Sequence, residues 1–396
     1  MALAPSPVAG PFAGLVVVDL THVLSGPYCT MLLAELGARV IKIEAPAEGD
    51  VARRLGPFID GRSAYFMTFN RGKESLALDL KNGSDRSVFE RLLDVADVLV
   101  ENFTPGVMDR LGYGWEALHA RHPRLVYAAV SGFGRTGPLA GRKANDLIAQ
   151  AMGGLMSVTG HPGGPPTRAG TAIGDMAAGV FAAYAVAAAL YDREHSGCGR
   201  LIDVSMLDCQ VALLEHAIAR YEATGESPGP MGSKHTSAAP FGVYDTADGH
   251  IALATAIDKD FRVLAASLGR PDLPDDPRFA SMPKRAANAA ALDEIVAPIL
   301  ARETTAHWLE LFEEAEVRAA PIQTVEEILR HPQVRARNIV VTADDPVIGP
   351  FRMPGNPVKM PAFPDPPTRR PAPDLDADRA RVLAELDDTN DRQDRG

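Results

Sequence analysis

The sequence contains few cysteines and lacks the common metal motifs. Its three cysteines are odd in number and do not have the spacing of a metal site or of a disulfide framework. There is no HExxH motif, no metal-ligand spacing among the histidines and no GxxxxGK[ST] phosphate loop. We therefore expect no bound metal and a reducing, cytoplasmic environment. We expect neither a redox nucleotide enzyme nor a serine hydrolase.

Long hydrophobic runs and an excess of positive charge are also missing. The longest lipophilic stretch, residues 177–191, is shorter than the ~20 residues of a membrane span and predicts a buried helix. The first residues, MALAPSPVAGPFAG, lack the charged start and apolar segment of a secretory signal. A net charge of -11 and a pI near 5.4 argue against a nucleic-acid partner. An anionic ligand is compatible with this charge, because a local basic pocket can form on an acidic protein.

Short apolar runs alternate with helix-like segments over the first two hundred residues. The predicted strands are residues 15–20, 39–44, 97–103, 125–130 and 201–206. The predicted helices are residues 30–36, 146–159 and 176–194, and a long helix that ends near residue 224. Runs such as LVVVDL are typical of buried parallel strands, which need crossover connections between them. The pattern predicts an α/β fold with an open, mostly parallel, Rossmann-like sheet.

The alternation stops at the segment GESPGPMGSKHTSAAP, which is rich in glycine, proline and serine. Beyond it we expect a hairpin at residues 242–254 and helices near 259–269, 285–301 and 304–315. The predicted domains are a large domain over residues 1–225, a smaller α+β domain over 226–325, and a return to the large domain over 326–396. The last twenty residues are strongly charged, and we expect this tail to be partly disordered.

Asp175 lies in the segment RAGTAIGDMAAG, between a glycine-containing turn and a very apolar helix. In one interpretation its carboxylate caps that helix by accepting backbone N–H bonds. In the other it is a reactive carboxylate at a sheet edge, where Gly174 lets a bulky electrophile approach. Both interpretations are compatible, because a helix N-terminus also positions an anion. Composition and spacing do not name a reaction.

The order of five segments resembles the class III CoA-transferase family. These segments are GLVVVDLTHVLSGPYCTMLLAELGARVIKIE, NRGKESLALDLKN, ADVLVENFTPGVMDRLGY, VSGFGRTGP and RAGTAIGDMAAG. The resemblance extends over about residues 12–362. The family includes formyl-CoA, carnitine-CoA and dicarboxylate CoA-transferases, and also the α-methylacyl-CoA racemases. It implies CoA thioesters as substrates, no permanently bound cofactor, and an interlocked homodimer.

The resemblance assigns roles to individual residues. The nucleophilic aspartate of the family corresponds to Asp175. The CoA contacts of the family correspond to Val23, Leu24, Ser25, Leu78, Lys81, Asn102, Phe103, Arg110 and Lys143. The basic residues in this set suit the 3′-phospho-ADP part of CoA. Leu78 and Phe103 would equally be core residues of any α/β protein, and Asn102 would equally cap a turn.

The racemase branch of the family is the alternative function. It deprotonates a 2-methylacyl-CoA with a histidine and an aspartate, and this sequence has Asn145 where that histidine would be. Asparagine takes up no proton at neutral pH, so one of the two bases is missing. The predicted reaction is therefore transfer of CoA from an acyl-CoA, such as succinyl-CoA, to a small dicarboxylic acid. It would proceed through an anhydride and then a CoA thioester of Asp175.

Two segments depart from the family pattern. The glycine-rich mobile loop of formyl-CoA transferase is not recognisable, and GSKHTSAAPF at residues 232–241 resembles the dicarboxylate-using members. Lys234, His235 and Arg168 are therefore predicted to bind the substrate together with Gly174. The LGEH-type segment near the C-terminus is replaced by PDLDADRARV, whose role the sequence does not indicate.

Overall fold

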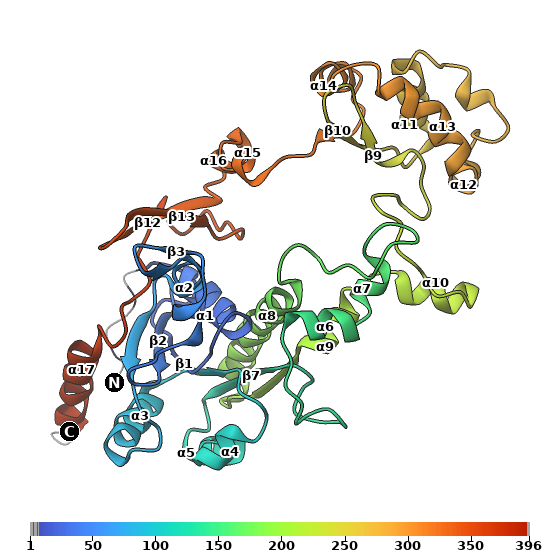
Figure 1. The fold of residues 1–396 in the computed structure, drawn as a ribbon. Helices are drawn as coiled ribbons and strands as arrows, with labels where there is room; N and C mark the ends of the chain where they lie inside the picture. Colours follow the sequence, from blue (N-terminus) through green and yellow to red (C-terminus); the bar gives the residue numbers. More distant parts are fainter. Residues whose placement is uncertain (1–2, 4–5, 7, 394–396) are drawn as a thin grey trace. The chain divides into compact units, whose positions relative to one another are not determined.

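A computed structural model describes residues 3, 6 and 8–393, which form two compact units (Figure 1). The larger unit comprises the chain up to Met156, the segment Arg168–Ile218 and the chain from Pro332 onward. The smaller unit comprises Ser157–Thr167 and Ala219–His331. The predicted domain boundaries remain predictions, and the structure additionally groups Ser157–Thr167 with the smaller unit.

A six-stranded parallel sheet forms the centre of the larger unit. Its strands are β1 (Val16–Asp19), β2 (Arg39–Glu44), β5 (Glu74–Ala77), β6 (Val98–Glu101), β7 (Val126–Ser131) and β8 (Leu201–Ser205). They lie in the order β5-β2-β1-β6-β7-β8, and each neighbouring pair is parallel. The predicted open, parallel, Rossmann-like sheet is confirmed. Because the strand order reverses between β1 and β6, a ligand crevice is expected at the carboxyl ends of these two strands.

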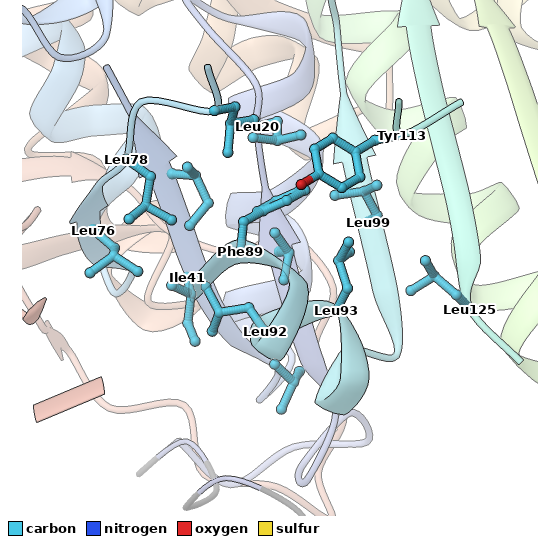
Figure 2. Packing of buried hydrophobic residues seen from close by; sticks show 14 of the residues in the cluster. Leu20, Ile41, Leu76, Leu78, Phe89, Leu92, Leu93, Leu99, Tyr113 and Leu125 are labelled. Atoms are coloured by element: carbon cyan, nitrogen blue, oxygen red, sulfur yellow. The ribbon is translucent and has the colours of Figure 1, made fainter. Parts of the chain in front are cut away.

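Helices pack on both faces of this sheet. The first face is covered by α3 (Gly83–Val95), α4 (Val107–Leu111), α5 (Trp115–Arg121) and α17 (Arg379–Gln393). The second is covered by α1 (Ser25–Glu35), α6 (Asp146–Met152), α8 (Ile173–Ser196) and α9 (Met206–Ala212). Figure 2 shows the first core, in which Phe89 of α3 lies among leucines that include Leu76 and Leu78. Helix α8 is long and apolar enough to cross a membrane, a property that the core helices of many proteins share. In this structure it packs against α1 and the sheet.

Shorter elements complete the larger unit. They are the 3-10 helix η1 (Val51–Arg54), β3 (Phe58–Ile59), β4 (Arg62–Ser63), α2 (Ala64–Asn70), α16 (Pro332–Ala336), β12 (Val340–Asp345), β13 (Gly349–Pro354) and β14 (Thr368–Arg369). The hairpin β12–β13 is extended by β14 into a three-stranded sheet. Two further helices, α7 (Leu155–Val158) and α10 (Ala217–Thr224), lie where the chain passes between the units.

The smaller unit contains one antiparallel sheet and several helices. Its three strands are β9 (Phe241–Asp245), β10 (His250–Ala254) and β11 (Ala319–Pro321), in the antiparallel order β11-β10-β9. Its other elements are α11 (Asp258–Ser267), η2 (Leu273–Asp275), α12 (Met282–Ala287), α13 (Ala289–Leu300), α14 (Thr305–Glu314) and α15 (Val325–Ile328). A separate core around Phe261, Phe279 and Phe312 holds the sheet and helices together. The hairpin predicted at residues 242–254 is confirmed as β9–β10.

Several predicted element boundaries are wrong. The helix predicted over residues 146–159 is interrupted after Met152, because Gly154 adopts a φ of 85° that ends a helix. The long helix after β8 is interrupted between α9 and α10. Strand β5 was not predicted at all. Where a partly disordered tail is expected, the chain forms α17, and residues 394–396 lie outside the described residues.

Candidate active site

Asp175 lies within the first turn of α8 rather than at its N-cap. The helix begins at Ile173, three residues before the predicted start, and Ala172 is its N-cap. The N-cap residue Ala172 makes no side-chain capping bond, and the N–H of Gly174 donates to Asp146 instead of Asp175, so the interpretation of Asp175 as a cap is wrong. The position is still electrostatically favourable for an anion, because the first turn carries the positive end of the helix dipole.

The carboxylate of Asp175 has an unusual environment for a partly buried aspartate. Across the described part of the chain, no hydrogen bond or ion pair to this carboxylate is found. Burial raises the pKa of Asp175 to about 7, and the negative charge of Asp146 contributes further. Both causes disfavour the ionised form, so the ionised carboxylate is a high-energy, poorly solvated anion. Such a group is a better nucleophile than an aspartate in water.

Asp146 holds the start of α8 against α6. Its Oδ1 atom accepts a 2.8 Å hydrogen bond from the backbone N–H of Gly174, and its Oδ2 atom accepts one of 2.8 Å from Gln150. A β-carbon at Gly174 would lie 3.0 Å from that Oδ1 atom, so glycine permits the contact. Arg168 lies 3.5 Å from the same carboxylate. Sequence reasoning missed Asp146 and Gln150, although their i, i+4 spacing on a helix indicates neighbouring side chains.

A close contact between α1 and α8 brings the predicted CoA-binding turn to the predicted nucleophile. Gly179 follows Asp175 by one helical turn and therefore lies on the same face of α8. A β-carbon at Gly179 would lie 2.7 Å from the carbonyl oxygen of Ser25 and 2.9 Å from the ring of Tyr28. Only glycine allows this approach, so Gly179 holds Ser25 against α8 one turn after Asp175. Ser25 and the preceding Leu24 are both buried.

The turn between β1 and α1 is fixed by buried polar groups. Val23 has a φ of 65°, a conformation that is costly for a β-branched residue. Its N–H donates a 3.1 Å bond to Asp50, which in turn pairs with the fully buried Lys42 at 2.9 Å. The amide of Asn102 accepts from the N–H of His22 and donates to its carbonyl oxygen, both at 2.8 Å. Asn102, a predicted CoA contact, therefore connects the carboxyl ends of β1 and β6.

The other predicted CoA contacts form two groups, apolar side chains at the core and basic side chains exposed to solvent. The side chain of Leu78 is in the core, as Figure 2 shows, and Phe103 packs partly against that core. Lys81, Arg110 and Lys143 are exposed, and among the described residues none of the three has an ion-pair partner. Lys81 follows β5 and Arg110 follows β6, so both lie after strands that end at the same sheet edge. Their roles stay predictions.

The predicted substrate-binding residues belong to different units. Arg168 is in the larger unit, whereas Lys234 and His235 are in the smaller one. Lys234 pairs with Asp293 at 3.0 Å and lies 3.8 Å from the centre of the Tyr244 ring. The ring of His235 lies 4.9 Å from that of Phe241. Because a lysine ammonium group has three N–H donors, binding of a distal carboxylate by Lys234 would share the ammonium with Asp293.

A cavity of about 310 Å³ lies beside the start of α8. Its lining includes Leu24, Tyr28, Met31, Tyr65, Phe69, Thr171, Ala172 and Met176, and is mostly apolar. Burial raises the pKa of Tyr65 to about 12, with further contributions from the negative charges of Asp175, Asp50 and Asp146. The hydroxyl of Tyr65 is therefore a protonated donor at neutral pH. A small apolar cavity with a few polar groups is typical of a ligand site.

Two glycine patterns have the spacing of known motifs without their structural context. Residues 132–137, GFGRTG, have the spacing GxGxxG after β7, but the next helix begins only at Asp146. Residues 225–229, GESPG, have the spacing GxSxG but follow a helix instead of a strand. Neither is therefore a dinucleotide fingerprint or a nucleophile elbow. Within residues 3, 6 and 8–393, no group of three His, Cys, Asp or Glu side chains is arranged to hold a metal.

Comparisons with known proteins show the family of this chain. Residues 12–379 match the family described as CoA-transferase family III. An acetyl-CoA:oxalate CoA-transferase of Acetobacter aceti is 46% identical over 96% of this chain and 97% of its own length. A succinyl-CoA:mesaconate CoA-transferase of Haloarcula hispanica is 39% identical over 95% and 96% of the two chains. The crystal structure of a CAIB/BAIF family protein from Brucella suis superimposes with a TM-score of 0.84 at 35% identity, covering 96% of this chain and 100% of that one.

Proposed function

The chain belongs to CoA-transferase family III, and we propose that it moves CoA from a short acyl-CoA to a small dicarboxylic acid through covalent intermediates on Asp175. It is accordingly a class III CoA-transferase, and its substrates are a CoA thioester and a carboxylic acid. Both relatives described above act on a dicarboxylic acid, oxalate in one and mesaconate in the other. We infer a short dicarboxylate for this enzyme as well.

The environment of Asp175 carries this proposal. Its carboxylate oxygen would attack the thioester carbonyl, and the CoA thiolate would leave to give an acyl–aspartyl anhydride. The thiolate would then attack the carbonyl of Asp175, which releases the donor acid and leaves an aspartyl–CoA thioester. The acceptor carboxylate would attack that thioester, and the released thiolate would finally attack the acceptor carbonyl of the new anhydride. Every step exchanges one acyl bond for another, so no metal or redox group is required.

The residues around Asp175 would assist these steps. Backbone N–H groups of nearby glycines would stabilise the tetrahedral oxyanions, each worth roughly 3 kcal/mol when well placed. The protonated hydroxyl of Tyr65 is a further donor on the cavity wall. The apolar lining of the 310 Å³ cavity would exclude water, which otherwise hydrolyses an anhydride.

Racemisation fits the same site less well. Asn145, which stands where the racemase histidine would be, caps α6 by accepting a 3.2 Å hydrogen bond from the N–H of Ile148. An amide that caps a helix supplies no base for an α-proton. Transfer of CoA requires only one carboxylate, and Asp175 provides it.

We also propose that the enzyme is a cytoplasmic homodimer. Apolar side chains on α6, α8 and α9 remain exposed in the single chain, among them Leu147, Val180, Tyr184 and Val211. Such a concentration of exposed apolar groups supports association with a second copy. The free thiols of all three cysteines agree with a reducing compartment. We propose neither a nucleic-acid nor a membrane partner.

Intact-mass analysis after mixing the enzyme with acetyl-CoA or succinyl-CoA tests the proposed chemistry. A CoA-sized adduct on the peptide that contains Asp175 is expected without an acceptor. Addition of oxalate, mesaconate, succinate or glutarate in turn should clear the adduct with one acid, which identifies the acceptor. If no adduct forms and deuterium instead enters the α-carbon of 2-methylpropanoyl-CoA or a longer 2-methylacyl-CoA, the racemase function would replace this proposal.

A further inference from the structure

Strand β5 is the edge strand of the parallel sheet, and the C-terminal segment occupies its outer side. The N–H of Ala77 donates a 2.8 Å hydrogen bond to the carboxylate of Asp376, and the guanidinium of Arg379 donates to the carbonyl oxygen of Ala77. The N–H of Ser75 donates to Asp378 at 2.9 Å. Side chains from the end of the sequence therefore satisfy backbone groups that an edge strand normally leaves unpaired.

Asp376 is held in place from several directions. Its φ of 62° is in the left-handed region, which aspartate tolerates better than most residues. Its N–H donates to the hydroxyl of Ser75 at 3.0 Å, and its second carboxylate oxygen accepts from Arg379 at 2.7 Å. The hydroxyl of Ser75 donates in turn to Glu44 at 2.6 Å. So many contacts at one residue fix both Asp376 and the strand that it touches.

The strand so fixed ends directly before a predicted part of the CoA site. Ala77 is the last residue of β5, and Leu78 and Lys81 follow it at the carboxyl edge of the sheet. The N–H of Leu78 donates to the carbonyl oxygen of Glu44 at 2.9 Å, which continues the pairing with β2. The side chain of Lys81 is exposed at this edge, where an anionic phosphate would be accessible to it.

We propose that Asp376 and Arg379 are positioning residues for the nucleotide part of CoA. They fix Ala77 and thereby set the course of the turn that carries Leu78 and Lys81. The inference rests on the proposed function, because it assumes that CoA lies along this edge. It also assigns a role to PDLDADRARV, the segment in which this sequence departs from the family pattern.

The position of β5 in the sheet indicates which end of CoA is affected. Two strand spacings of about 4.8 Å separate β5 from β1, whose turn lies beside the first turn of α8. A shift in the position of Ala77 is therefore expected to weaken binding of the nucleotide and to leave the position of the reacting thioester unchanged. If Asp376 and Arg379 only satisfied the backbone of the edge strand, their loss would affect the two ends of CoA alike. This difference makes the positioning role testable.

Binding of CoA and of 4′-phosphopantetheine, which lacks the nucleotide, distinguishes the two roles. Asp376→Gly removes the carboxylate and keeps a residue suited to positive φ, whereas Asp376→Asn retains an oxygen that accepts from Ala77. Asp387→Ala is the matched control, because it removes an ion pair of 2.7 Å between α17 and Arg91 of α3, away from Ala77. Calorimetry would give the dissociation constants, and acyl transfer at saturating CoA thioester would give kcat.

We expect Asp376→Gly to weaken CoA binding about tenfold, as the loss of one charged hydrogen bond would. Binding of 4′-phosphopantetheine and kcat should stay unchanged, and Asp376→Asn should recover most of the affinity. Asp387→Ala should resemble the unmodified enzyme. Equal weakening of both ligands, or no change in either, would overturn the inference alone. Unmodified enzyme that binds no CoA would overturn the proposed function and the inference together.

Discussion

The larger unit contains two aspartates, Asp19 and Asp175, whose carboxylates lie in opposite electrostatic environments. Asp19 ends β1 and is completely buried. Its carboxylate accepts from the N–H and hydroxyl of Thr21, from the hydroxyl of Thr30 at 2.7 Å, and from Lys73 at 3.0 Å. Asp175 is partly buried, and the described residues give its carboxylate no donor.

The pKa values of the two groups move in opposite directions for physical reasons. Burial alone would raise the pKa of Asp19, but the charges of Lys73 and Lys42 and the two threonine hydroxyls hold it well below its ordinary value. Burial raises the pKa of Asp175 to about 7, and Asp146 adds to the shift. Hydrogen-bond donors and cations near a buried carboxylate therefore decide whether its ionised form is stabilised or destabilised. Asp19 maintains the turn between β1 and α1, whereas Asp175 is the aspartate that we propose to react.

Replacement of Asp175 should have the largest effect on catalysis. Asp175→Ala removes the proposed nucleophile, and we expect the rate of acyl transfer to fall at least ~10⁴-fold, as when other covalent nucleophiles are removed. The far-ultraviolet circular dichroism and the affinity for CoA should stay near those of the unmodified enzyme. Steady-state assays with the donor and acceptor found by mass analysis provide the measurement. Transfer within tenfold of the normal rate would eliminate Asp175 as the nucleophile.

The same substitution at the two aspartates should change stability in opposite directions at pH 8. Asp19→Asn leaves Lys73 buried without its counter-charge, so we expect a loss of about 3–5 kcal/mol. Asp175→Asn removes a desolvated anion and should raise the free energy of unfolding by roughly 1–2 kcal/mol. The pKa of Asp175 is raised in the folded state, so the ionised carboxylate costs stability that Asp175→Asn restores. The gain in the free energy of unfolding should be complete above pH 7, decrease between pH 7 and pH 4, and vanish below about pH 4.

Urea denaturation followed by tryptophan fluorescence can isolate the larger unit. The chain has two tryptophans, and in a Trp308→Phe background only Trp115 of the larger unit reports. Asp192→Asn is the control, since it removes a half-exposed pair of 2.7 Å with Arg200 and should change stability by about 0.5 kcal/mol or less. Changes of the same sign at Asp19 and Asp175 would contradict the distinction between them.

The sequence predicts strands that contain several β-branched apolar residues and predicts poorly a short strand that has none. The segment RVIKIE of β2 is predicted with its observed bounds because of Val40, Ile41 and Ile43, although its three charged residues are also buried. Strand β5, ESLA, was missed because Glu74 reads as a surface residue, although it is buried in an ion pair of 2.9 Å with Arg39. Such pairing joins residues 35 positions apart, and no local pattern reveals it.

The candidate site shows the same division between local and distant information. Asp175 was identified from a contiguous motif, and its place in the first turn of α8 fits that motif. The proximity of Asp146 and the close approach of Gly179 to Ser25 depend on how α6, α1 and α8 pack. Likewise Asn102 was predicted to touch CoA, whereas its amide is occupied by the backbone of His22. Contacts across the fold therefore determine what each predicted residue can do.

The pH dependence of transfer should show the smallest of the expected effects. Only ionised Asp175 is nucleophilic, so kcat/KM should fall as the pH decreases through about 7. Asp146→Asn keeps an oxygen for the N–H of Gly174 but removes the negative charge that helps to raise the pKa of Asp175. The acid limb should therefore move to lower pH by less than about one unit, because burial, the larger cause, is unchanged.

Glu101 is the necessary control for the pH profile of kcat/KM, because burial raises the pKa of its carboxyl to about 7 as well. The N–H of Phe103 donates to this carboxylate at 2.7 Å and opposes the shift only in part. Glu101→Gln removes that titration and retains an acceptor for Phe103, and the acid limb should stay where it is. If the limb moved with Glu101→Gln and not with Asp146→Asn, the titrating group would be Glu101 at the end of β6. The raised pKa of Asp175 would then not determine the pH dependence of kcat/KM. The lack of hydrogen-bond donors at Asp175 would no longer be evidence that this aspartate, and not Asp19, is the reactive one.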